Sequence, residues 1–174
     1  MNPLDLAAAQ IGLNENDKAT ALRDYLHTGG INLDPATTAW CAAFVNATLK
    51  QSGQQGTGSN MARDFLTWGT GVTQPQPGDI AVFSRGDPNG PYGHVGFFQG
   101  YNPDGTIRVL GGNQGDAVSE ASYSPNALLG FRRGSTPNSL GAQPQPPATN
   151  ALAYQPQPAF QFDLSNLPRN RLRA

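Results

Sequence analysis

The chain has 174 residues, which is enough for one domain with a hydrophobic core and hardly enough for two. Its formal net charge of −1 gives no basic footprint for nucleic acid, and it contains no run of about 18 apolar residues that could span a membrane. Hydrophobic residues make up 37% and charged residues 13% of the chain, beside 21 glycines and 15 prolines. This composition favours a compact, loop-rich domain with some extended chain over a helical bundle.

The first part of the sequence predicts four helices. Asn2 is a candidate N-cap with Pro3 at the first helical position, and a Gly29-Gly30 pair marks the end of the second helix. The third helix carries Cys41 near its start, with apolar residues at helical spacing after it. We expect these helices at residues 3–11, 17–28, 38–52 and 61–69.

After "QPQPGD" the pattern changes to short β-rich runs separated by turn residues. The segment "YNPDGT" is a strong hairpin signal between the second and third of these runs. Helices followed by an antiparallel meander predict an α+β domain in which a five-stranded sheet packs on the helix that bears Cys41. We expect the strands at residues 80–84, 94–100, 106–112, 117–123 and 128–133.

The composition divides the chain into a domain at residues 1–134 and an extended arm at 135–174. The arm contains 7 of the 15 prolines and only one glycine, and proline favours extended polyproline II conformation. It ends in "FQFDLSNLPRNRLRA", an apolar and basic segment that is either a frayed tail or a docking peptide. The N-terminus lacks the basic start and apolar stretch of a secretory signal peptide, so we expect none.

Cys41 is the only cysteine. Of the two histidines in the sequence, one is flanked by glycines that leave space around its ring, and this one is the candidate partner of Cys41. His94 opens a strand between Gly93 and Gly96, whereas His27 ends a helix and is interpreted as a surface residue. Because 94–100 and 106–112 form a hairpin, the residues that follow the second strand lie beside the start of the first. We therefore expect Asn113 to be a neighbour of His94, with a turn-forming role as the alternative interpretation.

A cysteine, a histidine and an asparagine in this arrangement have a chemical purpose. The start of a helix and a nearby imidazolium lower the pKa of a thiol, and the thiolate is the reactive form. An imidazole can remove the thiol proton and later protonate a leaving amine, while a side-chain oxygen on its other nitrogen fixes the tautomer. Backbone N–H groups at the start of the helix can contribute to an oxyanion hole.

The motifs "AWCAAFVN", "ARDFLTWGT", "QPGDIAVF", "GHVGFF" and "IRVLGGNQGDAVS" occur in an order that resembles the NlpC-type and CHAP-type cell-wall cysteine peptidases. More narrowly, they are similar to a subgroup common in bacteriophages and prophages. The resemblance covers about residues 3–134. It implies a papain-like α+β fold that hydrolyses an amide bond of bacterial peptidoglycan and needs no cofactor.

By motif, the resemblance implies that Cys41 is the nucleophile, that His94 is the general base and acid, and that Asn113 orients the imidazole. Because the third position varies among relatives, Gln114 and Asp116 are alternatives. Many of these enzymes have "DCSGFV" around the nucleophile, whereas here Trp40 precedes Cys41 and an alanine follows it. The side chains of the oxyanion hole therefore stay unassigned.

Three aromatic residues are candidates for substrate binding: Trp40 beside the cysteine, Tyr92 beside the histidine, and Trp68, which is also a candidate core residue. The "PGD" of residues 77–79 is interpreted as a structural turn before the first strand. A zinc amidase is disfavoured because two distant histidines without an HExxH pattern give too few ligands, so we expect no metal.

The leading hypothesis is a phage-encoded peptidoglycan hydrolase that is carried in the virion or released from the host cytoplasm to the cell wall. Residues 140–174 would then tether it to tail or capsid proteins. The alternatives are a structural or binding virion protein that kept the fold without turnover, and a secreted antibacterial amidase toxin. The sequence alone leaves open which peptidoglycan bond is cut.

Overall fold

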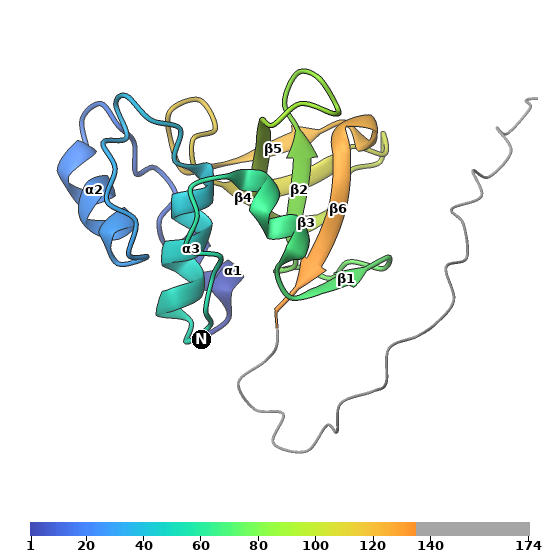
Figure 1. The fold of residues 1–174 in the computed structure, drawn as a ribbon, viewed down its shortest axis with the longest axis horizontal. Helices are drawn as coiled ribbons and strands as arrows, with labels where there is room; N and C mark the ends of the chain where they lie inside the picture. Colours follow the sequence, from blue (N-terminus) through green and yellow to red (C-terminus); the bar gives the residue numbers. More distant parts are fainter. Residues whose placement is uncertain (135–174) are drawn as a thin grey trace, which may run out of the picture. The chain divides into compact units, whose positions relative to one another are not determined.

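The computed structural model describes residues 1–134, and the predicted arm with its docking segment lies outside the described residues. The described part has helices in its first half and strands in its second half (Figure 1). Its elements are α1 (Pro3–Ala8), α2 (Ala19–His27), α3 (Cys41–Gln51), the 3-10 helix η1 (Ala62–Thr67), β1 (Thr70–Val72), β2 (Ile80–Ser84), β3 (Gly93–Tyr101), β4 (Ile107–Gly111), β5 (Ser119–Tyr123), the 3-10 helix η2 (Pro125–Ala127) and β6 (Leu128–Arg133).

The strands form one antiparallel sheet in the order β1-β6-β2-β3-β4-β5. The α+β class is confirmed and is consistent with the papain-like fold, but the prediction of five strands was wrong because β1 forms a sixth. In β1, Thr70 lies opposite Arg133 and Val72 opposite Phe131 of β6. A three-residue segment with a central glycine has no alternating apolar pattern, so only its pairing with β6 defines it as a strand.

Helix α3 is the central helix of the domain, and every residue from Cys41 to Leu49 is buried. A helix that is buried on all sides and mostly apolar belongs in a core, and its alanines allow the neighbouring elements to approach closely. Phe44 meets Phe97 of β3 edge-on, with ring centroids 6.5 Å apart, and Tyr25 of α2 packs on Phe44 at 5.6 Å. In Figure 1 the three α-helices lie together on one side of the sheet.

The sheet buries apolar side chains on both faces. On the helix side, Val82, Val95 and Phe97 belong to the cluster that includes α3. The other face carries a second cluster, in which Phe98 packs edge-on against Phe131 at 5.2 Å. The central strands are therefore held from both sides, which gives the start of β3 a rigid position.

An ion pair with a buried carboxylate joins the turn before β2 to the end of β6. Asp79 is 5% exposed, and it accepts hydrogen bonds from Arg133 at 2.8 Å (Nε to Oδ1) and 2.7 Å (Nη2 to Oδ2). The Gln76 backbone N–H donates to Oδ2 of the same carboxylate at 2.7 Å. These contacts agree with the structural interpretation of the "PGD" turn. No helix within residues 1–134 is both long and apolar enough to cross a membrane.

Candidate active site

Cys41 and His94 lie on neighbouring elements of the core. Cys41 is the first residue of α3 and is 5% exposed, while His94 is the second residue of β3 and is 8% exposed. The backbone N–H of Val95, the residue after His94, is close enough to the Cys41 sulfur to act on the pKa of the thiol, which it lowers. The thiol thus lies beside the strand that carries the imidazole.

Gln114 holds the imidazole of His94. The distance from His94 Nε2 to Gln114 Oε1 is 3.0 Å, and both side chains are buried. The Gln114 amide nitrogen donates to the backbone carbonyls of Ser119 and Val109, so the amide oxygen is the atom that faces His94. Because an oxygen can only accept a hydrogen bond here, the neutral ring carries its proton on Nε2. The lone pair is then on Nδ1. The imidazole is thereby fixed as a base at Nδ1.

The other two candidates for the orienting role occupy the turn around Gln114. Asn113 (φ 57°) and Asp116 (φ 60°) both have left-handed backbone conformations, which asparagine and aspartate tolerate better than most residues. Within the described residues, neither side chain hydrogen-bonds His94. The hairpin brings this turn to His94 as expected, but Asn113 reverses the chain and Gln114 is the residue whose side chain returns to the sheet.

Tyr123, at the end of β5, completes the surroundings of His94, and sequence reasoning missed it. Its ring stacks on the imidazole with centroids 5.0 Å apart, and its hydroxyl donates to Gln114 Oε1 at 3.0 Å. Phe83 also stacks on Tyr123, with centroids 4.6 Å apart. The alternation of Ser119, Ala121 and Tyr123 along β5 was the available signal, because it places the phenol on one face of the sheet.

Burial controls the protonation of the pair. It lowers the pKa of His94 to about 4, against a smaller opposite effect of the hydrogen bond to Gln114. Burial also raises the pKa of Cys41, while the N–H groups of Val95, Ala42 and Cys41 and the charge of Arg85 act in the opposite direction. At neutral pH the resting pair is therefore a neutral thiol and a neutral imidazole.

A cavity of about 170 Å³ opens beside Cys41. Tyr92, which is 69% exposed, lies on its rim, in agreement with its place among the candidate substrate contacts. Met61 and Ala62 give the cavity an apolar side. Its lining residues are Thr38, Ala39, Cys41, Asn60, Met61, Ala62, Arg85, Tyr92 and Gly93.

The two tryptophans take structural positions. Trp40 is 0% exposed and donates from Nε1 to Glu15 Oε2 at 2.8 Å, so its ring has no surface to offer a substrate. A Cβ atom at Gly112 would lie 2.6 Å from this ring, which shows how closely the chain after β4 crosses it. Trp68 donates to the Gln55 carbonyl at 2.7 Å and does not line the cavity at Cys41.

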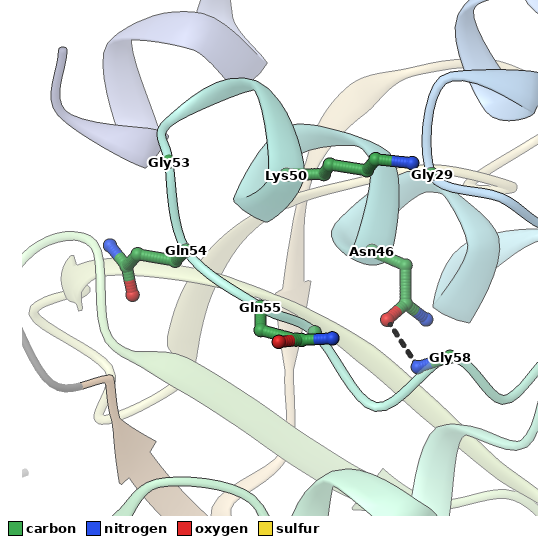
Figure 2. A pocket seen from close by; sticks show the side chains of 8 residues that line it. Gly29, Asn46, Lys50, Gly53, Gln54, Gln55 and Gly58 are labelled. Carbon is green, nitrogen blue, oxygen red and sulfur yellow. Dashed lines mark hydrogen bonds between the residues drawn. The ribbon is translucent and has the colours of Figure 1, made fainter.

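A larger cavity of about 420 Å³ lies farther along α3 (Figure 2). Lys50, Gln54 and Gln55 line it, together with Asn46, whose side chain accepts from the Gly58 N–H at 3.0 Å. The Asn46 amide nitrogen also donates to the carbonyls of α3 and of the returning loop. This side chain therefore ties the loop to the helix. The lining contains no cysteine and no histidine, whereas Cys41 lines the smaller cavity, so the smaller cavity is the candidate active site.

Residues 33–113 match the family model of the CHAP domain, and the match includes both Cys41 and His94. This segment of the chain is similar to the CHAP domain. The resemblance to CHAP-type cell-wall peptidases is confirmed, whereas the bacteriophage subgroup stays a prediction. A comparison with curated proteins finds no match. The CHAP domain supports a peptidoglycan hydrolase, and Gln114 follows directly after the matched segment. Within residues 1–134, no cluster of three histidine, cysteine or acidic residues could hold a metal ion.

Proposed function

We propose that this protein hydrolyses an amide bond of peptidoglycan with Cys41 as the nucleophile, His94 as the general base and acid, and Gln114 as the residue that positions the imidazole. The observation that carries the proposal is the hydrogen bond from His94 Nε2 to the Gln114 oxygen, at the start of the strand that neighbours the helix that begins at Cys41. The CHAP domain supplies the substrate class.

The reaction follows from the protonation states of the resting site. His94 Nδ1 takes the thiol proton as the Cys41 sulfur attacks the substrate carbonyl carbon, and an oxyanion forms. The N–H groups at the start of α3 face this region and are the candidate oxyanion donors. The imidazolium then protonates the leaving amine and the C–N bond breaks, which leaves a thioester. Water, deprotonated by His94, hydrolyses the thioester and restores the thiol.

The test is digestion of purified peptidoglycan by the wild type and by Cys41→Ala and His94→Ala, with mass spectrometry of the released fragments. We expect fragments from the wild type alone, and their masses identify the bond: free stem peptides for an amidase, and cleaved stems or cross-bridges for an endopeptidase. Equal release by Cys41→Ala would refute the mechanism, and no release from sacculi of diverse hosts would favour the non-catalytic alternative.

We further propose a phage origin and a place in the virion, supported by the motif resemblance and by the proline-rich composition of residues 135–174. A secreted antibacterial toxin is the competing source of the same domain. The test uses phage particles that encode a truncated protein, from which residues 140–174 are deleted. If the truncated protein is active as a hydrolase but is missing from purified particles, residues 140–174 act as a tether. If it is incorporated normally, the tether hypothesis is refuted.

A further inference from the structure

We propose that the cavity beside Cys41 is a carboxylate subsite, in which Arg85 selects peptidoglycan peptides that carry a free carboxylate close to the scissile amide. This inference rests on the proposed function, because it names the chemistry of the group that the same site accepts.

Arg85 gives the cavity its charge. It is the one charged residue among those that line the cavity, and it shares that lining with Cys41 and Tyr92. Its backbone N–H donates to the Tyr92 carbonyl at 3.2 Å, so the two ends of the loop between β2 and β3 are held together at the cavity. A group bound at Arg85 therefore lies within the cavity that also reaches the thiol.

No acidic side chain neutralises Arg85. Within residues 1–134 the ion pairs join Arg23 to Asp34 and Arg133 to Asp79, and neither involves the cavity. Asp87 lies on the same loop, but its Oδ1 accepts the Asn89 backbone N–H at 2.9 Å. The Arg85 guanidinium is exposed and keeps its donors for a ligand. A planar guanidinium pairs best with a planar carboxylate, through two parallel hydrogen bonds.

Arg63 holds the loop between β2 and β3 in place, so that this loop can form one side of the binding cavity. From η1 it donates to the Tyr92 carbonyl at 3.0 Å and to the Pro88 carbonyl at 2.8 Å. Both partners are neutral, so the Arg63 charge adds to the positive potential around the cavity. A preordered, positive rim binds an anion at a lower entropic cost than a mobile loop would.

The charge of Arg85 also reaches the reacting groups. It lowers the pKa of Cys41 and of His94, which agrees with its place at the cavity. Loss of Arg85 will therefore slow every substrate to some extent through a less acidic thiol. The informative measurement is the ratio of two substrates cleaved by the same variant, because an effect on the thiol cancels in that ratio.

The experiment compares synthetic disaccharide peptides in two matched pairs: D-isoglutamate against D-isoglutamine, and meso-diaminopimelate against its amidated form. We expect the wild type to cleave the carboxylate member of at least one pair about tenfold faster in kcat/KM, mainly through KM, as a partly exposed charged hydrogen bond implies. Arg85→Gln should abolish this preference and Arg85→Lys should retain part of it. Arg108→Gln, an exposed arginine on β4 outside the cavity, should behave as the wild type.

The outcomes separate the inference from the function on which it rests. Equal cleavage within both pairs by an active wild type, or an unchanged preference in Arg85→Gln, overturns the subsite and leaves the hydrolase intact. Failure to cleave any peptide, together with no release from sacculi, overturns the proposed function and the subsite with it.

Discussion

The ring of Tyr123 stacks on the imidazole of His94 with centroids 5.0 Å apart, and its hydroxyl donates to the same Gln114 oxygen that His94 contacts. One side chain thus fixes both the plane of the base and the acceptor that sets its tautomer. Burial raises the pKa of Tyr123 to about 12, so the phenol stays protonated and remains a donor at any pH at which the protein works.

Tyr123→Phe keeps the stacked ring and removes the hydrogen bond to Gln114. Because a neutral hydrogen bond contributes about 1 kcal/mol, we expect kcat to fall by up to about tenfold with KM nearly unchanged. Tyr123→Leu should lower kcat further because it also removes the stacking. Steady-state kinetics on a soluble muropeptide check both variants, with Tyr101→Phe as the control for an exposed tyrosine. A change in KM alone would contradict a positioning role.

The competition between Gln114 and Asn113 for the orienting role has a direct test. Gln114→Ala leaves His94 Nε2 without its acceptor, and we expect kcat to fall by about 100-fold or more. Asn113→Gly removes the amide while tolerating the positive φ of 57°, so its activity should stay close to that of the wild type. Circular dichroism establishes that both variants are folded. The reverse order of activities would return the role to Asn113.

The buried histidine makes stability depend on pH in a defined range. The folded protein protonates His94 only near pH 4, whereas the unfolded chain takes up this proton near the ordinary value of 6.5. Between these values the unfolded state binds more protons, so the free energy of unfolding falls as the pH drops from 6.5 towards 4, by up to about 3 kcal/mol. Above pH 6.5 this group contributes no pH dependence.

Chemical denaturation of the wild type and of His94→Gln across pH 4 to 7 measures this contribution, because the carboxylates titrate alike in both proteins. We expect the wild type to lose stability relative to the variant on acidification. A difference that stays constant with pH would show that His94 is protonated as readily in the folded protein as in the unfolded chain.

The ion pair of Asp79 and Arg133 should stabilise the fold without affecting the chemistry. Asp79→Asn removes the charge of a buried carboxylate with three hydrogen-bond donors, and we expect it to lower the free energy of unfolding by about 2 kcal/mol. The exposed pair of Arg23 and Asp34, 3.8 Å apart, is the control, and Asp34→Asn should cost less than about 0.5 kcal/mol. Thermal melts and kinetics check both variants. An equal loss in the free energy of unfolding in the two variants would contradict the special role of burial.

The sequence predicted the features of the fold that have a local cause. The N-cap at Asn2, the hairpin at "YNPDGT" and the five longer strands follow from residue types and their periodicity. The edge strand β1 was missed because its conformation depends on β6, far away in the sequence. The helix expected from Thr38 begins instead at Cys41, since Trp40 has φ −123° and ψ 14° and its ring is fixed by Glu15 and the chain at Gly112.

The sequence predicted the candidate nucleophile and base, but it did not predict which side chains contact the imidazole. Cys41 and His94 were predicted because few residue types can serve as nucleophile and base, and the hairpin placed the turn that contains Gln114 beside His94. The choice between Asn113 and Gln114 depends on which side chain turns inward, and that depends on two positive φ angles within the turn. Tyr123 comes from β5, and its contact with His94 exists only once β3, β4 and β5 lie side by side.

The neutral, covered state of Cys41 has a consequence for the lifetime of the protein. The thiolate is the form that attacks peroxides and disulfides, so a buried thiol with a raised pKa reacts with them slowly. Peptidoglycan lies outside the cytoplasmic membrane, where conditions are oxidising and thiols are rarely kept reduced. The burial that makes His94 a neutral base therefore also shields the proposed nucleophile from oxidation until a substrate enters the cavity.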